Sequence, residues 1–446
     1  MTATPGRHGR PPAASAVGGL LSLGIAVLAP RIGGAQTIEY PSTSKAEVVD
    51  EYHGTSVADP YRWLEDTESV QTARWVADQN ALTFAYLASV PERENIRQRL
   101  TELWDYERYG LPFREGGRYF YFKNDGLQNQ SVLYAQEELG GEARVLLDPN
   151  LLSDDGTVAL TNVAVAESGE YLGYGTAAGG SDWREFRVRR VADGLDLPDR
   201  VRWVKFSGLS WSKDGGGFFY SRYPETSVAD SLLGQNRNQM LYYHRLGTAQ
   251  DDDLLVYARP DQPEWSFGGE VTDDGRYLVI RVGYGTDERE RIYYLDLGPG
   301  ETPVLDGQVV RLLDDFDASY DFVGNVGSLF YFVTDLKAPR GRVIAIDLED
   351  PDPESWREIV AERNDVLQSA WIIAGRLVTR HLRDAHGRLS VFALAGDRER
   401  KIALPTLGTI SGVTGEPGGT EMFFSFTSFL YPTTVFRHDF ESGTTA

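Results

Sequence analysis

The spacing of apolar residues divides the chain into a helical part and a β part. Between about residues 66 and 106, apolar side chains recur every three or four positions, as they do on one face of a helix. Pro91 interrupts this pattern, so the segment is expected to form two amphipathic helices. The apolar residues of the stripe are Val76, Leu82, Ile96, Leu100 and Leu103.

From about Gly116 onward the apolar period changes to two. Short aromatic or β-branched runs, such as Tyr119 to Phe122 and Leu329 to Val333, each follow a glycine turn. The glycines that precede seven such runs are 52, 46, 60, 52, 48 and 44 residues apart. They are Gly117, Gly169, Gly215, Gly275, Gly327, Gly375 and Gly419. This period is typical of propeller blades, each of which needs its neighbours to complete its core.

The two patterns together predict a mainly β protein. We expect a seven-bladed β-propeller over residues 111–446, preceded by a short α-helical N-terminal segment over residues 37–110. Each blade is expected to contain four strands.

The N-terminus resembles an export signal. The first ten residues carry two arginines and no acid, and Ala13 to Ala29 is an apolar run interrupted only by serine and glycine. That run is too short and too rich in glycine to span a membrane readily, and Gly33-Gly34-Ala35 supplies the small residues that a signal peptidase needs. We predict a signal peptide over residues 1–35, export to the periplasm or the extracellular space, and no membrane attachment after cleavage. An uncleaved anchor, or a start codon assigned too far upstream, is the alternative.

Charge and cysteine content exclude several classes of function. The chain has 44 basic and 66 acidic side chains, so its formal net charge is −22. A protein with this balance is not expected to bind nucleic acid through its phosphates. With no cysteine, it can form no disulfide, thiolate nucleophile or Cys-ligated metal site.

Six short segments add a resemblance to these patterns. They read Asp59-Pro-Tyr-Arg-Trp-Leu-Glu-Asp66, Gly126-Leu-Gln-Asn-Gln130, Leu152-Ser-Asp-Asp-Gly-Thr-Val-Ala-Leu160, Gly180-Ser-Asp-Trp183, Leu241-Tyr-Tyr-His244 and Phe424-Ser-Phe-Thr-Ser-Phe429. In this order they resemble the prolyl oligopeptidase family of serine peptidases. The resemblance implies an N-terminal segment and a seven-bladed propeller ahead of an α/β-hydrolase domain with the catalytic Ser, Asp and His. It also implies short proline-containing peptides as substrates, with the propeller excluding large folded ones.

The sequence departs from that family in its catalytic part. It stops at Ala446, where the hydrolase domain is expected to begin, and no serine has glycine both two residues before and two residues after it. Ser181 and Ser210 come nearest, and each lacks the second glycine. We therefore expect this chain to lack the catalytic domain, to contribute no catalytic residue and to be inactive alone. A short peptide is an expected partner only when a hydrolase domain is joined to it.

The resemblance also implies one substrate-contact residue. The family places an aromatic side chain of its substrate cavity in the strand that here reads Arg202-Trp-Val-Lys-Phe206, so Phe206 is the candidate. An ordinary apolar position at a blade interface is the alternative. A family arginine that reaches the cavity falls on Gly283 here, so that contact is lost or is supplied by Arg281.

Metal and cofactor sites are not expected. His381 and His386, with Asp384 between them, have a spacing that would suit a loop metal site, but a solvated hairpin turn is favoured. The acidic runs at residues 251–253 and 314–317 lack the ligand register of a calcium loop. Glycine pairs such as that at residues 283–285 precede no helix, so nucleotide binding is unsupported.

Two other functions remain open at this point. The first is a stand-alone propeller that binds partners through its central channel. The second is catalysis within that channel by paired carboxylates, as in glycosidases, which requires acids from different blades to converge on the axis.

Overall fold

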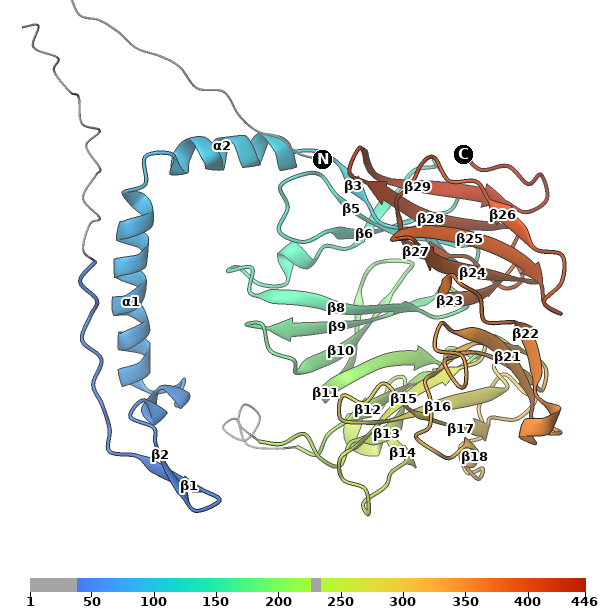
Figure 1. The fold of residues 1–446 in the computed structure, drawn as a ribbon, viewed down its shortest axis with the longest axis horizontal. Coiled ribbons are helices and arrows are strands. Elements are labelled where there is room, and N and C mark those ends of the chain that lie inside the picture. Colours follow the sequence, from blue (N-terminus) through green and yellow to red (C-terminus); the bar gives the residue numbers. More distant parts are fainter. Residues whose placement is uncertain (1–37, 226–233) are drawn as a thin grey trace, which may run out of the picture. The chain divides into compact units, whose positions relative to one another are not determined.

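The computed structural model describes residues 38–225 and 234–446. Contacts along the chain separate two compact units, residues 1–98 and residues 99–446, and each is described by itself. Figure 1 traces the elements in chain order.

The first unit contains a hairpin and helices. The hairpin pairs β1 (Val49–Tyr52) with β2 (Thr55–Ala58), and a 3₁₀ turn, η1 (Arg62–Glu65), precedes α1 (Val70–Ala88). Ser69 caps α1, because its hydroxyl oxygen accepts the backbone N–H of Thr72 at 3.1 Å.

The predicted break between two helices is confirmed. Helix α1 ends at Ala88, α2 (Arg93–Trp104) begins after Pro91, and α2 continues into the second unit. Ile96, Leu100 and Leu103 of the stripe are each at least half exposed. None of the helices in the described part of the chain is long and apolar enough to cross a membrane.

The second unit is built from antiparallel sheets. The first contains β3 (Arg108–Tyr109), β4 (Phe113–Glu115), β5 (Arg118–Asn124), β6 (Val132–Gln136) and β7 (Arg144–Leu147). The second contains β8 (Val158–Val165), β9 (Tyr171–Ala178), β10 (Arg184–Arg190), β11 (Asp196–Trp211), β12 (Gly217–Arg222), β13 (Met240–Arg245) and β14 (Leu254–Tyr257).

Four further sheets follow in chain order. They contain β15 (Trp265–Val271), β16 (Tyr277–Tyr284), β17 (Arg291–Asp296) and β18 (Val310–Leu313); β19 (Tyr320–Val326), β20 (Leu329–Thr334), β21 (Arg342–Asp347) and β22 (Arg357–Val360); β23 (Val366–Ile373), β24 (Arg376–Arg383), β25 (His386–Ala393) and β26 (Arg400–Ile402); and β27 (Thr409–Thr414), β28 (Glu421–Ser428) and β29 (Tyr431–Asp439). Short 3₁₀ turns lie at η2 (Pro149–Leu151), η3 (Gln250–Asp252) and η4 (Pro353–Ser355).

The prediction of seven separate four-stranded blades is wrong. Among the described residues of the second unit, hydrogen bonding gives six sheets, five with four or more strands and one with three. The cause is β11, which is 16 residues long and pairs with β10 along its first part and with β12 along its second. The units that Gly169 and Gly215 mark are therefore one continuous sheet. A glycine turn marks where a hairpin reverses and does not show where a sheet ends.

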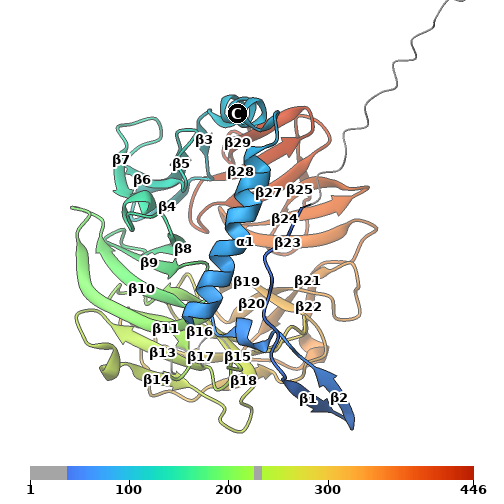
Figure 2. The same cartoon turned by 90° about the vertical axis from the view of Figure 1, so that its left-hand side faces the viewer.

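The core lies between neighbouring sheets. Figure 2 shows the sheets following one another around a ring in chain order. The ring starts with the sheet of β5, passes through the sheets of β16 and β20, and ends with the sheet of β28. Buried clusters combine residues of adjacent sheets, for example Phe219 of β12 with Phe267 of β15, and Val343 of β21 with Leu377 of β24. Stacking of one sheet on the next therefore supplies the burial that each lacks alone.

The first and last sheets meet through side chains. The Tyr119 hydroxyl donates to Glu421 Oε1 at 2.6 Å, and the Tyr119 ring lies edge-on to Phe423 at 6.3 Å between centroids. The ring of sheets is therefore closed by packing and polar contacts of β5 with β28.

Candidate substrate-contact site

The strand that carries Phe206 is interrupted in the middle. The pairing of β11 with β12 shifts register between Val204 and Leu209, so the chain bulges there. Phe206, within this bulge, has φ 55°, and Trp203, in the neighbouring register shift of β11 against β10, has φ 61°, so both lie in the left-handed region. This conformation costs an L-residue about 1–2 kcal/mol, and bulky residues rarely adopt it. Two such residues within four positions of one strand point to a site whose shape is used.

Aromatic rings gather on this bulge. The Trp183 and Trp203 rings meet edge to face with 5.6 Å between centroids, and Tyr223 lies 6.1 Å from Trp183 in the same manner. The Lys205 ammonium lies 5.1 Å from the Trp183 ring centroid and 5.3 Å from that of Phe206. These contacts are cation–π interactions, which combine an apolar surface with a positive charge. We call Trp183, Trp203, Lys205, Phe206 and Tyr223 the aromatic step.

A buried amide holds the backbone of the aromatic step. Gln239, 1 % exposed, donates from Nε2 to the carbonyl oxygen of Lys205 at 2.9 Å and accepts the N–H of Phe267 at 2.6 Å. The N–H of Tyr223 donates to the carbonyl oxygen of Trp203 at 3.0 Å. Tyr223 directly follows β12, Gln239 directly precedes β13 and Phe267 lies on β15, so the backbone of the aromatic step is held by the neighbouring segments of the chain.

Phe206 itself faces solvent. Its side chain is 58 % exposed, whereas Lys205 is 12 % exposed and lies 3.9 Å from Asp182. The exposure argues against the alternative that Phe206 packs at a blade interface. Its contact with substrate stays a prediction. The arrangement can hold an apolar side chain against the ring, with an electronegative group near the Lys205 ammonium.

Comparison with known proteins decides the family. The family model described as "Prolyl oligopeptidase, N-terminal beta-propeller domain" matches residues 40–446. The chain belongs to the prolyl oligopeptidase family.

Its curated relatives are longer proteins. A prolyl endopeptidase of Elizabethkingia miricola is 34 % identical over 426 residues, which cover 95 % of this chain and 59 % of the relative. Prolyl oligopeptidase A of Amanita bisporigera is 33 % identical over 436 residues, covering 90 % of this chain and 56 % of the relative. The chain thus spans less than two thirds of these relatives and corresponds to their N-terminal propeller part.

Solved structures of the family have the same fold. Prolyl oligopeptidase B from Galerina marginata, bound to a 25mer macrocyclization substrate, matches with a TM-score of 0.83 and 28 % identity, covering 92 % of this chain and 60 % of that one. A structure from a study of two prolyl endopeptidases matches with a TM-score of 0.71 and 37 % identity, covering 91 % and 58 %.

In this prolyl oligopeptidase propeller, Arg281 is already paired. Its Nε lies 2.9 Å from Glu290 Oε2, and its Nη2 lies 3.1 Å from Asp321 Oδ1. The structure therefore gives Arg281 a role in joining β16 to the neighbouring sheet, through Asp321 of β19.

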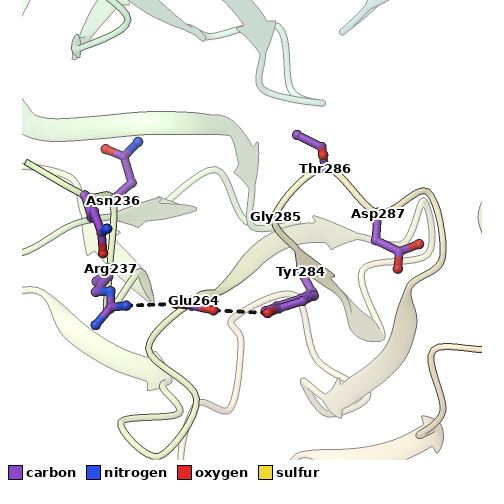
Figure 3. A pocket seen from close by; sticks show the side chains of 8 residues that line it. Asn236, Arg237, Glu264, Tyr284, Gly285, Thr286 and Asp287 are labelled. Atoms are coloured by element: carbon purple, nitrogen blue, oxygen red, sulfur yellow. Dashed lines mark hydrogen bonds and ion pairs between the residues drawn. The ribbon is translucent and has the colours of Figure 1, made fainter. Parts of the chain in front are cut away.

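A polar pocket lies near the end of β16. Its volume is about 610 Å³, and Figure 3 shows Arg237, Glu264 and Tyr284 joined in one line. Glu264 accepts from Arg237 Nη2 at 2.8 Å and from the Tyr284 hydroxyl at 3.1 Å. The bond to Glu264 raises the pKa of Tyr284. Sequence patterns do not predict this pocket, because its residues follow no motif or spacing.

A cavity of about 970 Å³ is lined by residues from several sheets. Its carboxylates are Glu115, Glu167, Asp273, Asp274 and Glu416, so the cavity is acidic. Burial, together with the charges of Glu416, Glu167 and Asp273, raises the pKa of Glu115 to about 7. Lys213 pairs with Glu167, and Arg114 lies 3.6 Å from Glu416. Acids of different sheets do converge here, as the glycosidase alternative requires, but the family relationship does not favour that chemistry.

The residues considered for a metal are not brought together. Among the described residues, no group of three or more His, Asp or Glu side chains is arranged to hold a metal ion. His381 is buried on β24, while His386 begins β25 opposite Arg383 and lines a different pocket.

Proposed function

We propose that the full-length protein is a prolyl oligopeptidase-type serine endopeptidase that cleaves short proline-containing peptides. This chain would supply its propeller, which filters substrates by size. The observation that carries the proposal is the exposed Phe206 of the family propeller, held in a strained bulge beside the Lys205 ammonium.

The serines of this chain support the need for a hydrolase domain. Ser181 lies in the turn between β9 and β10. Ser210 lies on β11, and its hydroxyl oxygen accepts the backbone N–H of Val271 at 2.9 Å, so it joins two sheets. Acyl transfer needs a nucleophile with an adjacent base and oxyanion donors.

Export is part of the same proposal. The predicted signal peptide, residues 1–35, lies outside the described residues. Its basic start and apolar run support transport to the periplasm or the extracellular space.

Replacing Phe206 by alanine should leave the propeller stable and weaken peptide binding. Because the ring is 58 % exposed, the free energy of unfolding should fall by less than about 1 kcal/mol. In the full-length enzyme, KM for a short proline-containing peptide should rise about tenfold, as expected for loss of an apolar contact. Denaturant melts and steady-state kinetics measure the two effects.

Leu195→Ala is a matched control, since Leu195 is 62 % exposed and lies outside the aromatic step. A loss of about 3–5 kcal/mol in Phe206→Ala would place the ring in a packed interface. An unchanged KM would remove Phe206 from the substrate site.

A further inference from the structure

A small pocket on the sheet of β23 to β26 has an unusual charge. Its volume is about 240 Å³, and it is lined by one face of β24, β25 and β26 and by the loop between β22 and β23. The chain as a whole carries −22 formal charges, yet four cationic side chains and two carboxylates line this pocket. The cations are Arg363, Arg383, Arg388 and Lys401, and the carboxylates are Asp365 and Glu399.

The carboxylates do not saturate the cations. Asp365 is shared, lying 3.6 Å from Arg383 Nε and 3.4 Å from Arg388 Nη1. Both distances exceed the 2.7–2.9 Å of a strong charge-assisted hydrogen bond. Lys401 forms no ion pair within the described part of the chain. Each guanidinium carries five N–H groups, so several donors remain for a ligand.

Glu399 is bound by Arg363 and Ser390. Both its oxygens lie within 3.0 Å of Arg363 Nη1, and Oε1 accepts from the Ser390 hydroxyl at 2.9 Å. The pocket therefore has one closed ion pair, between Arg363 and Glu399. Arg383 and Arg388 share Asp365, and Arg383 also lies 3.6 Å from Asp384 Oδ2, so neither guanidinium has a close carboxylate of its own.

A buried imidazole also lines the pocket. His381 is 4 % exposed, lies opposite Arg388 in the pairing of β24 with β25, and makes no ring hydrogen bond within the described residues. Burial, and then the charge of Arg363, lowers the pKa of His381. The ring is therefore neutral at pH 7 and has one N–H to donate. Because His381 lines the pocket, a ligand there can accept this N–H.

We propose that this pocket binds a tetrahedral oxyanion of the phosphate type. Guanidinium groups match the geometry of phosphate oxygens, the Lys401 ammonium adds charge, and the His381 N–H supplies a neutral donor. The excess of cations excludes a metal ion as the ligand. Free phosphate and a phosphate group carried on a peptide share this chemistry.

Calorimetry with sodium phosphate, at an ionic strength held constant with sodium chloride, tests the proposal on the whole protein. We expect saturable binding with a dissociation constant of about 1 mM or below. Arg383→Gln and Lys401→Gln should each weaken it about tenfold, because each removes one charge-assisted contact. His381→Phe, which keeps a planar ring, should weaken it without removing a charge.

Arg400→Gln is the matched control, since Arg400 is the neighbour of Lys401 on β26 and does not line the pocket. It should bind phosphate as the unmodified chain does, and thermal melts verify that all four variants are folded. O-Phosphoserine competing with phosphate would identify a carried phosphate group as an acceptable ligand, and failure to compete would restrict the site to the free ion. No saturable binding, or equal weakening in Arg400→Gln and Arg383→Gln, would overturn the proposal.

Discussion

His244→Ala should lower the free energy of unfolding by about 3–5 kcal/mol, the range measured when one partner of a buried ion pair is removed. His244 is fully buried, and its Nδ1 lies 2.7 Å from Asp253 Oδ1 while its Nε2 lies 3.2 Å from Asp199 Oδ1. The two carboxylates are 1 % exposed or less, so the alanine variant leaves them without their shared cation.

The network spans the continuous sheet. Asp199 belongs to the first part of β11, His244 to β13, and Asp253 precedes β14. The Tyr220 hydroxyl of β12 also donates to Asp253 Oδ2 at 2.6 Å. His244 therefore links β11 to the segment before β14 within the seven-stranded sheet. Removing it should lower the free energy of unfolding.

The same network sets a dependence on pH. Burial alone opposes the charged imidazolium, but the hydrogen bonds to Asp199 and Asp253 raise the pKa of His244 to about 9. A group whose pKa is higher in the folded state stabilises it fully below its ordinary value, here 6.5. That contribution is lost as the pH rises through about 9. Urea melts from pH 6 to 10 measure it.

His53→Ala is the control, because His53 is exposed in the hairpin of the first unit. It should change neither the stability nor its pH dependence. Equal melts for His244→Ala and the unmodified chain, or stability that increases between pH 8 and pH 10, would contradict the role of the network.

Gly396→Ala should destabilise the chain by roughly 2–5 kcal/mol, adding left-handed strain to overpacking. Gly396 lies in the turn between β25 and β26 with φ 85°, and a Cβ there would come 1.9 Å from the carbonyl oxygen of Ile359. Because Ile359 belongs to β22, the added methyl group would push two neighbouring sheets apart. Chemical denaturation measures the loss.

Gly375→Ala separates the two causes. Gly375 has φ 65°, but a Cβ there meets no atom within 4 Å. It should cost only the backbone strain of about 1–2 kcal/mol. If both variants lost the same free energy, close stacking of β22 against the turn before β26 would not contribute.

Local patterns in the sequence predicted local structure well. The helical period and Pro91 gave the two helices, and the alternation of apolar residues with glycine turns gave the hairpins. These patterns could not predict that two expected blades form one sheet. That sheet depends on the pairing of β11 with both β10 and β12, and the spacing of glycines does not encode these hydrogen bonds. The left-handed backbone of Trp203 and Phe206 could not be predicted from the sequence either, since neither residue type favours that conformation.

The polar sites required the tertiary structure. Asp199 on β11, His244 on β13 and Asp253 just before β14 are separated in the sequence and share no spacing that would group them. The sequence spacing groups His381 with His386 in one loop, whereas in the fold His381 lines a pocket with Arg363, Arg383, Arg388 and Lys401. Only the resemblance to the family directed attention to Phe206, and the structure added its exposure and strain.

Hydrolysis of a proline-containing chromogenic peptide tests the central claim most directly, because that claim is that this chain is the propeller part of a prolyl peptidase. The 446-residue chain alone should show no turnover, since none of its serines lies in a G-x-S-x-G elbow. Joined to the part of the Elizabethkingia miricola prolyl endopeptidase that it does not match, the chain should give turnover that this part alone does not reach. Specific hydrolysis by the purified chain, abolished by changing one of its own residues, would contradict the account, as would a folded fusion whose propeller made no difference to turnover.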